Sequence, residues 1–397
     1  MIRHLFTLMW NRRRANGLLV LEIFLAFVVL FAVGSLSVYL QRNYRAPLGF
    51  DYQNVWQIDM NPGNQPGPEQ FGALQRVLQR LRVTPGVVSA TRSADNTPFA
   101  FNDNSTGFRP DTGDGERKVQ SNFYYAGPEM REVLGLHLVA GRWFDRRDEA
   151  NARHQPLVIT ELAQAKLFPG GESAVGKTIR DSDNDAYRVI GVSGPYRAGG
   201  ELSEPQAGVF AYVSPQDTAR AMFVLLVRVQ PGSGAALEKR LSDDIRATSG
   251  GWTSGIFTLP EQRLTQLKLL LTLPVVLAVV CLFLLINVAL GLFGVLWLNI
   301  NQRRGELGVR RAMGAPAGAI SRQVVGEVLV LTTFGLLLGL LVAVQFPLLE
   351  AFDVPAGVYF TAMMLAAVGL YALAAGCALY PSRLAAGIQP AVALREE

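Results

Sequence analysis

The sequence predicts an α-helical membrane protein with four transmembrane helices and a large, two-lobed α+β extracytoplasmic domain between helices 1 and 2. Half of its 397 residues are apolar and only 17% are charged, whereas about 25% are charged in an average soluble protein. The apolar residues gather in four runs, each with at least the roughly 20 residues that a helix needs to cross a bilayer. Residues 41–267, of ordinary composition, separate the first run from the other three.

Each apolar run is predicted to be a helix, because backbone polar groups in hydrocarbon must find their hydrogen-bond partners within the segment itself. The first run follows a basic segment, as in a secretory signal. It is too long for a cleaved signal and lacks a convincing cleavage site, so it is predicted to remain as an anchor. The second run exceeds the length that a bilayer needs, so its start is expected to project as a stalk. The predicted transmembrane segments are 17–40, 268–298 with the stalk, 324–347 and 358–381.

The charges of the short loops predict the orientation, since Lys and Arg gather on the cytosolic side. Four arginines precede the first span, and five lie in the loop between helices 2 and 3. The loop between helices 3 and 4 contains Glu350 and Asp353 and no basic residue. The predicted cytosolic segments are therefore 1–16, 299–323 and 382–397, so that both termini are cytosolic, and the predicted outer segments are 41–267 and 348–357.

Two strand–helix–strand units are predicted at the two ends of the outer domain, where apolar residues change from alternate to helical spacing and back. They are expected to form one membrane-proximal lobe, 41–117 with 215–267. The segment 118–214 is predicted to be an inserted, strand-rich lobe, and 102–116, rich in Asp, Asn, Gly and Thr, a mobile loop. The predicted strands of the two units are 55–60, 87–91, 222–229 and 254–259, their helices are 69–82 and 235–247, and the short helices of the inserted lobe are 128–134 and 161–168.

The segment 171–178 matches the phosphate-binding pattern GxxxxGK[ST] letter for letter. That pattern binds nucleotides when a strand precedes it and a helix follows it, because the helix N-terminus receives the phosphates. Here Phe168-Pro169-Gly170 precedes the pattern and an Asp-rich turn, 181–185, follows it. We therefore interpret it as a false match that binds no nucleotide. The residues concerned are Gly171, Gly176, Lys177 and Thr178.

Candidate catalytic and metal-binding groups are scarce in this sequence. It has only three histidines, and both cysteines, Cys281 and Cys377, fall in predicted spans. Neither a Cys–His metal site nor a His-based catalytic set can be assembled from them, and disulfides cannot hold the outer domain together. Lys and Arg form no dense block interleaved with aromatic residues, which argues against nucleic-acid binding. We expect no metal, no bound cofactor and no catalytic residue, so the chain is not predicted to be an enzyme by itself.

The loop between helices 2 and 3 contains the most specific motif, QRRGELGVRRAMGA at 302–315, followed by Ile320, Val324 and Glu327. It resembles the coupling segment of the MacB/FtsX-type permeases of ABC transporters, with the pattern RxxEIGxxRAxGA and a later Glu. Other segments resemble that family's outer-domain and C-terminal motifs in the same order, so the resemblance covers nearly the whole chain. They are LGLHLVAGRWF at 134–144, LVITELAQAKLF at 157–168, VGKTI at 175–179, YRVIGV at 187–192 and YPSRLAAGIQPAVALR at 380–395.

The resemblance implies a stand-alone permease subunit in a bacterial inner membrane, with a MacB-like periplasmic core domain, an FtsX-like transmembrane region and no ATPase domain of its own. ATP and Mg would then bind to a separate cytosolic ABC ATPase dimer, and a second permease copy or a related permease would complete the complex. A periplasmic adaptor and an outer-membrane channel are further candidate partners. The chain departs from the family pattern at Ala317-Gly318, where basic residues are common, and this departure bears on how tightly the ATPase would dock.

Export of a drug-like or peptide substrate is the function that the resemblance favours, because the outer domain is large and two-lobed. Lipoprotein release is one alternative. Another is a signalling role by mechanotransmission, in which the chain moves no substrate and activates an extracytoplasmic partner. A receptor that senses an extracellular ligand without any ATPase is a further alternative.

A short helix at 306–313 is expected to present its arginines to the cytosol and to seat in a groove of the ATPase. The alternative is that these arginines only fix the topology of the loop, although topology requires neither Glu306 nor the glycines. Gly314 would let the chain turn back toward helix 3. The predicted ATPase-coupling residues are Arg303, Arg304, Glu306, Arg310, Arg311 and Gly314.

Two acidic residues, Glu22 and Glu327, lie in predicted apolar segments near the cytosolic face. They are expected to reach water or to pair with Arg13, Arg14 or Arg322; a role in gating or subunit contact is the alternative. Small residues at four-residue spacing in helices 3 and 4 predict close helix packing, within the chain or against another permease. These packing residues are Gly335, Gly339 and Gly376, with Gly369 and Ala372.

Overall fold

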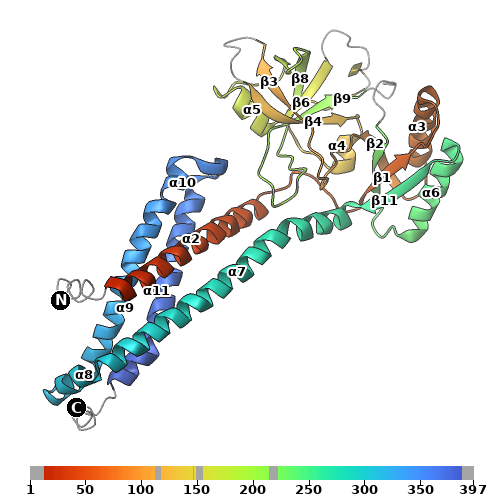
Figure 1. Cartoon of the computed structure of the whole chain (residues 1–397). Helices are drawn as coiled ribbons and strands as arrows, with labels where there is room; N and C mark the ends of the chain where they lie inside the picture. The colour runs from red at the N-terminus through yellow and green to blue at the C-terminus, as the bar shows by residue number, and fades with distance from the viewer. Residues whose placement is uncertain (1–12, 112–117, 146, 149–154, 214–221, 387–397) are drawn as a thin grey trace. The chain divides into compact units, whose positions relative to one another are not determined.

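The computed structural model describes residues 13–111, 118–145, 147–148, 155–213 and 222–386. The chain forms two compact units. The helical unit comprises Met1–Arg42 and Leu271–Glu397, and the α+β unit comprises Asn43–Leu270. Two helices, α2 (Arg13–Tyr44) and α7 (Leu259–Gln302), continue from one unit into the other (Figure 1).

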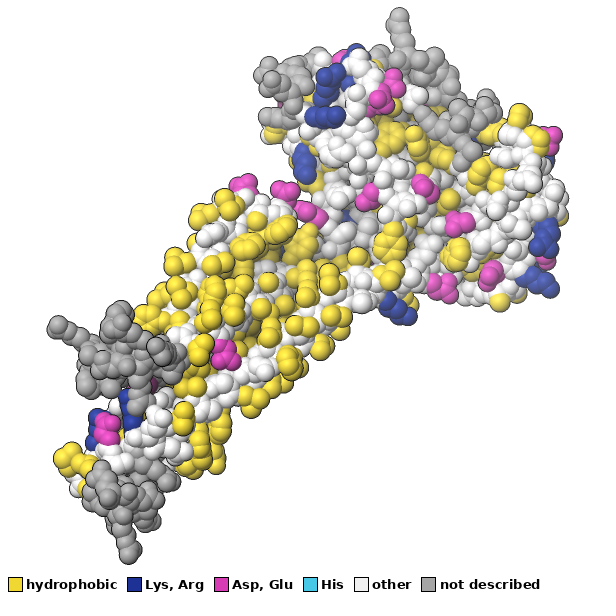
Figure 2. All heavy atoms as spheres, in the orientation of Figure 1, with side chains coloured by type: hydrophobic (Ala, Val, Ile, Leu, Met, Phe, Trp, Pro, Cys, Tyr) yellow, Lys and Arg dark blue, Asp and Glu magenta, His cyan; other side chains and the backbone are white. Residues whose placement is uncertain are grey.

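The helical unit is built from long apolar helices, and apolar side chains cover much of its visible face (Figure 2). Within the described residues, four helices are long and apolar enough to cross a membrane: Gly17–Tyr44, Leu259–Gln302, Ala317–Leu348 and Ala356–Leu384. After α7 the elements are α8 (Arg304–Ala312), α9 (Ala317–Ala343), α10 (Gln345–Leu348), the 3₁₀ helix η2 (Ala351–Asp353) and α11 (Ala356–Ala386).

Helix α7 is 44 residues long, which corresponds to about 66 Å at a rise of about 1.5 Å per residue. The predicted stalk and the predicted second span are therefore one continuous helix. A capping box fixes where it begins. The Thr258 hydroxyl accepts from the Glu261 backbone N–H at 3.2 Å, and the Glu261 carboxylate accepts from the Thr258 N–H at 3.2 Å.

The two predicted strand–helix–strand units interleave in one antiparallel sheet of the order β11-β1-β10-β2. The central pair places Val55 opposite Arg228 and Asp59 opposite Val224. Helices α3 and α6 bury their apolar stripes together with this sheet. The elements are β1 (Val55–Asn61), α3 (Gly67–Arg82), β2 (Val87–Ser93), β10 (Val224–Val229), α6 (Ala235–Ser249) and β11 (Thr253–Thr258).

The strand-rich lobe is a seven-stranded sheet of the order β5-β8-β6-β9-β4-β3-β7, in which an additional β7–β8 pairing closes a ring of strands. The ring encloses Phe108, Ile159, Ile179, Val189 and Val209, all fully buried. Its strands are β3 (Ser105–Pro110), β4 (Val119–Ala126), β5 (Leu138–Gly141), β6 (Gln155–Thr160), β7 (Thr178–Arg180), β8 (Ala186–Ser193) and β9 (Gly208–Tyr212), and its short helices are α4 (Met130–Leu134) and α5 (Glu161–Leu167).

The structure corrects the prediction of a mobile loop at 102–116, and with it the boundary at 118 between the lobes. Strand β3 lies in that segment and pairs with β4 on one side and β7 on the other. The Gly- and Thr-rich composition predicted a loop, but both edges of β3 find partners in the closed ring, and such tertiary pairing overrides weak strand propensity. Residues 112–117 lie outside the described residues.

The two lobes of the α+β unit share one apolar cluster. It joins Val55 and Leu226 of the first sheet to Val158 and Phe210 of the second. Leu259, the first residue of α7, lies in the same cluster and is fully buried. The start of α7 is therefore anchored in the core of the α+β unit.

Candidate coupling site and the side chains that position it

Helix α8 is amphipathic and follows α7 after a single residue. Its Leu307 is 6% exposed and belongs to the apolar core of the helical unit, together with Ile300 of α7 and Ile320 of α9. Val309 and Met313 are 43% and 77% exposed. A short helix that is fixed by one buried leucine and exposes two apolar side chains is suited to dock into a groove of another protein.

A chain of polar contacts ties α8 to α9. Arg310 donates to Glu306 Oε1 at 2.6 Å and to Gln323 Oε1 at 3.0 Å. Gln323 donates to Glu327 Oε1 at 3.2 Å, and Arg303 Nη1 lies 3.4 Å from both oxygens of Glu327. We call these five residues the α8–α9 polar chain. Because Glu306 and Arg310 lie on α8 while Gln323 and Glu327 lie on α9, a displacement of α8 must alter contacts made by α9.

The polar chain gives two arginines of this segment partners within the chain, while the expectation that the arginines face the cytosol stays a prediction. Arg303 and Arg310 turn onto α9, because Gln323 and Glu327 lie one helical turn apart there and present their oxygens to them. Glu327 pairs with Arg303, which is not among the partners that the sequence suggested, namely Arg13, Arg14 and Arg322. The prediction that these arginines contact an ATPase stays a prediction.

The remaining predicted coupling residues lie on or next to α8. Gly314 has φ +94°, a conformation that costs glycine little and other residues more. The Ala315 N–H donates to the Arg310 carbonyl at 3.1 Å and closes the last turn of α8. Arg304 and Arg311 lie in α8, and their side chains are outside the part of the chain that the structure describes.

Glu22 of α2 lies against Gly291 of α7. A Cβ atom at position 291 would come within 2.7 Å and 2.8 Å of the two carboxylate oxygens of Glu22. The glycine therefore makes room for an acidic side chain between two helices. The sequence analysis did not single out Gly291, although a glycine among bulky apolar residues is a signal of close approach in a membrane helix.

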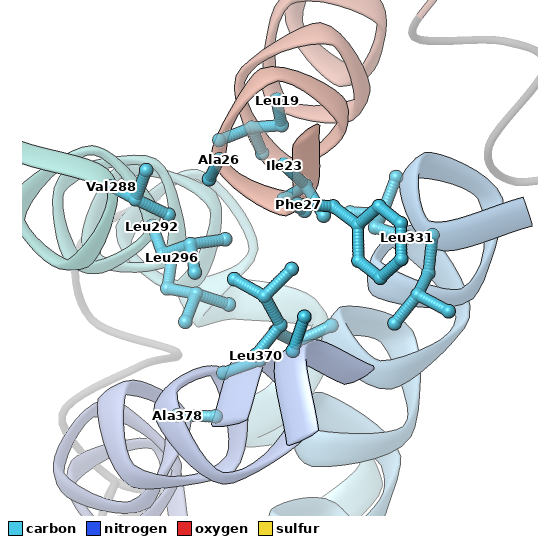
Figure 3. Close-up of a cluster of buried hydrophobic side chains, with 14 of the residues drawn as sticks. Leu19, Ile23, Ala26, Phe27, Val288, Leu292, Leu296, Leu331, Leu370 and Ala378 are labelled. Carbon is cyan, nitrogen blue, oxygen red and sulfur yellow. The ribbon is translucent and has the colours of Figure 1, made fainter. Parts of the chain in front are cut away.

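Gly335 and Gly339 let α2 approach α9 closely, as their spacing predicts. A Cβ atom at 335 would lie 2.7 Å from Cγ2 of Ile23, and one at 339 would lie 2.2 Å from Cδ1 of Phe27. Ile23 and Phe27 are 1% and 0% exposed. Figure 3 shows Phe27 of α2 directed toward α9 beside Leu331. This small-residue face packs within the chain.

The glycines of α11 behave differently. A Cβ atom at Gly369 or Gly376 would meet no atom within 4 Å. Neither glycine therefore serves packing against the described part of the chain. Their contact with another permease stays a prediction.

A buried arginine in the α+β unit holds the end of α2. Arg197 is 3% exposed. Its guanidinium donates to the carbonyls of Asn43 and Ala46, at 2.9 Å each, to that of Glu201 at 2.9 Å, and to that of Ser203. A cation at the C-terminus of a helix interacts favourably with its unpaired carbonyls and with the helix dipole.

The same loop also holds the start of α7. The Glu201 carboxylate, largely buried, forms an ion pair with Arg263 of α7. The Arg263 guanidinium lies 5.2 Å from the ring centre of Tyr52. We call residues 196–203 the clasp loop, because it binds the end of α2 and the start of α7. The sequence analysis missed it; the available signal was a single arginine in the glycine-rich segment 194–200.

The phosphate-binding pattern at 171–178 lacks the preceding strand and the following helix that nucleotide binding requires. Helix α5 precedes it and strand β7 follows it. Its backbone is engaged in pairing, since the Gly176 N–H donates to the Val189 carbonyl at 2.8 Å and the Val189 N–H to the Lys177 carbonyl at 2.9 Å. Lys177 forms an ion pair with Glu172 and lies 4.5 Å from the ring centre of Phe168. This geometry provides no cradle for phosphate.

The motif GRWF at 141–144 serves folding of the strand-rich lobe. Gly141 has φ +72°, and the Arg142 guanidinium bonds both oxygens of the buried Asp148 at 2.6 Å and 2.7 Å. Beside it, hydrogen bonds from Arg147 hold the pKa of Asp145 well below its usual range. Among the described residues, no group of three or more His, Cys, Asp and Glu is arranged to hold a metal ion.

Long apolar helices joined to a two-lobed α+β unit, with a short amphipathic helix between two of them, define a membrane permease. Residues 17–244 match the family model described as MacB-like periplasmic core domain. Residues 276–390 match the model described as FtsX-like permease C-terminal. The chain belongs to the MacB/FtsX-type family of ABC transporter permeases. Neither matched model is an ATPase domain.

Curated relatives include two macrolide export ATP-binding/permease proteins called MacB. The one from Paracoccus denitrificans is 29% identical over 296 residues, which cover 70% of this chain and 41% of the relative. The one from Sodalis glossinidius is 26% identical over 294 residues, which cover 68% of this chain and 43% of the relative. The chain therefore spans less than half the length of these relatives.

Solved structures of outer domains also resemble the chain. The periplasmic region of MacB from Actinobacillus actinomycetemcomitans has a TM-score of 0.38 at 19% identity and covers 57% of this chain and 97% of that one. The extracellular domain of the ABC-type transporter YknZ from Gram-positive bacteria has a TM-score of 0.34 at 17% identity and covers 51% of this chain and 100% of that one.

Proposed function

We propose that the chain is a permease subunit that couples a separate cytosolic ABC ATPase to work done by the α+β unit, with export of a drug-like or peptide substrate as the work. The α8–α9 polar chain is the observation that carries the coupling role. It links a short helix with exposed apolar residues directly to a long apolar helix through five side chains. Both MacB relatives are described as macrolide export proteins, which supports export as the function.

In the proposed mechanism, ATPase motion displaces α8, and α7 conveys the displacement as a rigid rod. Helix α7 is continuous from Gln302, two residues before the start of α8, to Leu259 in the core of the α+β unit. The clasp loop binds the start of α7 through Glu201 and the end of α2 through Arg197. Two rods held by one loop would move the α+β unit as a body.

The remaining partners follow from this proposal. The α+β unit would lie outside the cytoplasmic membrane, and both termini and α8 would be cytosolic. A second permease copy or a related permease would complete the complex, with a periplasmic adaptor and an outer-membrane channel as further candidates. ATP and Mg would bind to the ATPase.

The test is co-purification of the full-length chain from its native host in mild detergent, followed by an ATPase assay. Met313→Asp places a charge on the exposed apolar surface beside α8 and is expected to abolish recovery of a P-loop ATPase. Phe352→Asp is the matched control, because Phe352 is 83% exposed at the loop between α9 and α11, and it should retain the ATPase. If the wild-type chain brings no ATPase, the proposal fails and a receptor becomes the better account. Equal recovery with both variants would reject α8 as the docking surface.

A further inference from the structure

The α+β unit contains a cavity of about 500 Å³ beside the start of α7. Pockets that bind small molecules usually measure about 300–1,000 Å³. Strands β1, β10 and β11, the segment after β2, and the first two turns of α7 form its wall. A ligand in this cavity would touch the helix that continues to α8.

The described wall of the cavity carries negative charge. Asp59, Asp95 and Glu261 line it, and among the described lining residues there is no Lys, Arg or His. The Asp95 carboxylate accepts from two neutral amides, those of Asn102 at 3.0 Å and Asn104 at 3.4 Å. Three carboxylates around one cavity focus a negative potential that favours a positively charged ligand.

The rest of the wall is apolar and aromatic. Phe99, Phe101 and Phe257 line the cavity with Val224. Phe101 and Phe257 are 61% and 45% exposed, although both are large apolar residues. Aromatic faces attract organic cations, and exposed rings offer apolar contact to the body of such a ligand.

Two local features indicate that the wall is built for an occupant. Phe99 has φ +66°, which is strained for a bulky residue, and its N–H donates to the Ala198 carbonyl of the clasp loop at 2.7 Å. On α7, Oε1 of Gln262 is buried and has no hydrogen-bond partner among the described residues. A buried acceptor without a donor is costly, and a ligand N–H would satisfy it.

We propose that this cavity binds an organic cation, namely an amine or ammonium group on an apolar or aromatic body. The ammonium lies among Asp59, Asp95 and Glu261 and donates to Gln262. The body contacts Phe101. Binding of the cation requires no ATPase, so a binding assay tests this proposal independently of the proposed function.

Binding can be measured by isothermal titration calorimetry on the full-length chain in detergent. The probes are phenethylamine and tryptamine, with 3-phenylpropionate as an anion of similar size and apolar area. The wild-type chain is expected to bind both amines at one saturable site and to bind 3-phenylpropionate at least tenfold more weakly. Equal heats from the amines and the anion, or no saturable binding of either amine, would overturn the proposal.

Two double variants that change the net charge equally distinguish binding in the cavity from non-specific attraction to the protein's overall charge. Asp59→Asn/Asp95→Asn removes two carboxylates from the wall and is expected to weaken amine binding at least tenfold. Glu238→Gln/Asp243→Asn removes two exposed carboxylates from α6 and is expected to leave binding unchanged. Equal effects of the two double variants would refute a site in this cavity.

A third variant tests the aromatic wall. Phe101→Ala removes a ring that is 61% exposed, so the substitution leaves the core intact. It is expected to weaken tryptamine binding several-fold while the thermal unfolding temperature stays within the wild-type range. Unchanged affinity would contradict the assignment of the ligand body to this wall.

Discussion

At the scale of single residues, Arg197 joins two segments of the α+β unit through backbone carbonyls. Its buried guanidinium donates to four backbone carbonyls, two near the end of α2 and two within the clasp loop. Backbone carbonyls that lose a buried donor cannot regain one from water, and each such loss costs about 1–3 kcal/mol. A side chain of this kind fixes geometry more than it adds net stability.

Replacing Arg197 with Met is therefore expected to lower the free energy of unfolding of the full-length chain by about 3 kcal/mol, since several carbonyls lose their donor at once. Chemical denaturation followed by circular dichroism measures the change. Arg246→Met, at an exposed position on α6, is the matched control and should change stability by less than about 0.5 kcal/mol. Similar losses of unfolding free energy in the two variants would show that the contacts of Arg197 do not stabilise the chain more than those of an exposed arginine.

The glycines of α9 give a second prediction at this scale. Gly339→Ala places a Cβ atom 2.2 Å from the Phe27 ring and is expected to destabilise the helical unit by about 1–3 kcal/mol through overpacking. Gly376→Ala meets no atom within 4 Å and should be neutral or slightly stabilising. Thermal unfolding in detergent measures both. A larger loss from Gly376→Ala would instead place that glycine in a contact between chains.

At the scale of elements, the pair of α8 and α9 is held by charge and amide contacts rather than by apolar area. Among the described side chains of α8, Leu307 is the one that lies in the core of the helical unit. The polar chain supplies the remaining attachment, with Arg303 and Glu327 as the ion pair that reaches α9. The side chains of Arg303 and Glu327 are 19% and 27% exposed, so the pair is partly buried but still reaches water. Ion pairs that reach water contribute little net stability, typically below about 1 kcal/mol, and they restrict the positions that a helix can take.

Reversing one charge of this pair should therefore lower the ATPase rate of the complex more than it lowers the stability of the chain. Arg303→Glu or Glu327→Arg alone is expected to lower the stimulated ATPase rate of the complex at least fivefold, because like charges then face each other. The double variant Arg303→Glu/Glu327→Arg should recover most of the rate. Failure of the double variant to recover any activity, with the ATPase still bound, would mean that the pair does not transmit motion.

The stability of the strand-rich lobe is expected to fall at alkaline pH. Burial raises the pKa of Tyr124 to about 12 and raises the pKa of Tyr196 well above its usual value. Burial, followed by the charge of Asp181, raises the pKa of Tyr187. These tyrosines ionise at lower pH in the unfolded chain than in the folded one. The free energy of unfolding must fall as the pH rises above about 10.

An alkaline titration checks this sign. Absorbance at 295 nm should show that part of the tyrosines ionise only together with loss of circular dichroism, at a pH above 10. Tyr124→Phe should reduce the slope of stability against pH above pH 10 and leave it unchanged near neutrality. A gradual titration of all tyrosines with the fold intact would contradict the expected burial.

At the scale of the whole molecule, two helices carry the chain between its two compact units, and α7 does so without interruption. The clasp loop and the organic-cation cavity both border the start of α7. A signal that travels along α7 would therefore reach both features. The proposed function requires that this helix stays rigid.

Insertion of two glycines between Leu270 and Leu271 tests that rigidity. The assay uses a Cys281→Ala/Cys377→Ala background with a fluorophore on Val139→Cys, a half-exposed site in β5. ATP is expected to change the fluorescence of the uninterrupted chain in its complex. The insertion should abolish that change while ATPase recovery persists. A persisting ATP-dependent signal would show that α7 is not the transmitting rod.

The structure was predicted best from the sequence where one physical requirement dominates. Apolar length and the need to satisfy backbone groups in hydrocarbon predict the long helices, and alternate spacing predicts the strand–helix–strand units. The spacing of Gly335 and Gly339 predicted a close helix contact, but it could not say that the partner is α2.

The sequence by itself determined the two kinds of unit, because these depend on composition and short-range order. The class of protein and the coupling segment followed from the resemblance of its motifs to those of a permease family. Only the tertiary structure decided that β3 is a strand, that Arg303 pairs with Glu327 and that Arg197 holds the end of α2. Each of these depends on residues that are distant in the sequence and meet in space. No local pattern contains that information, since a side chain's partner is chosen by the packing of the elements around it.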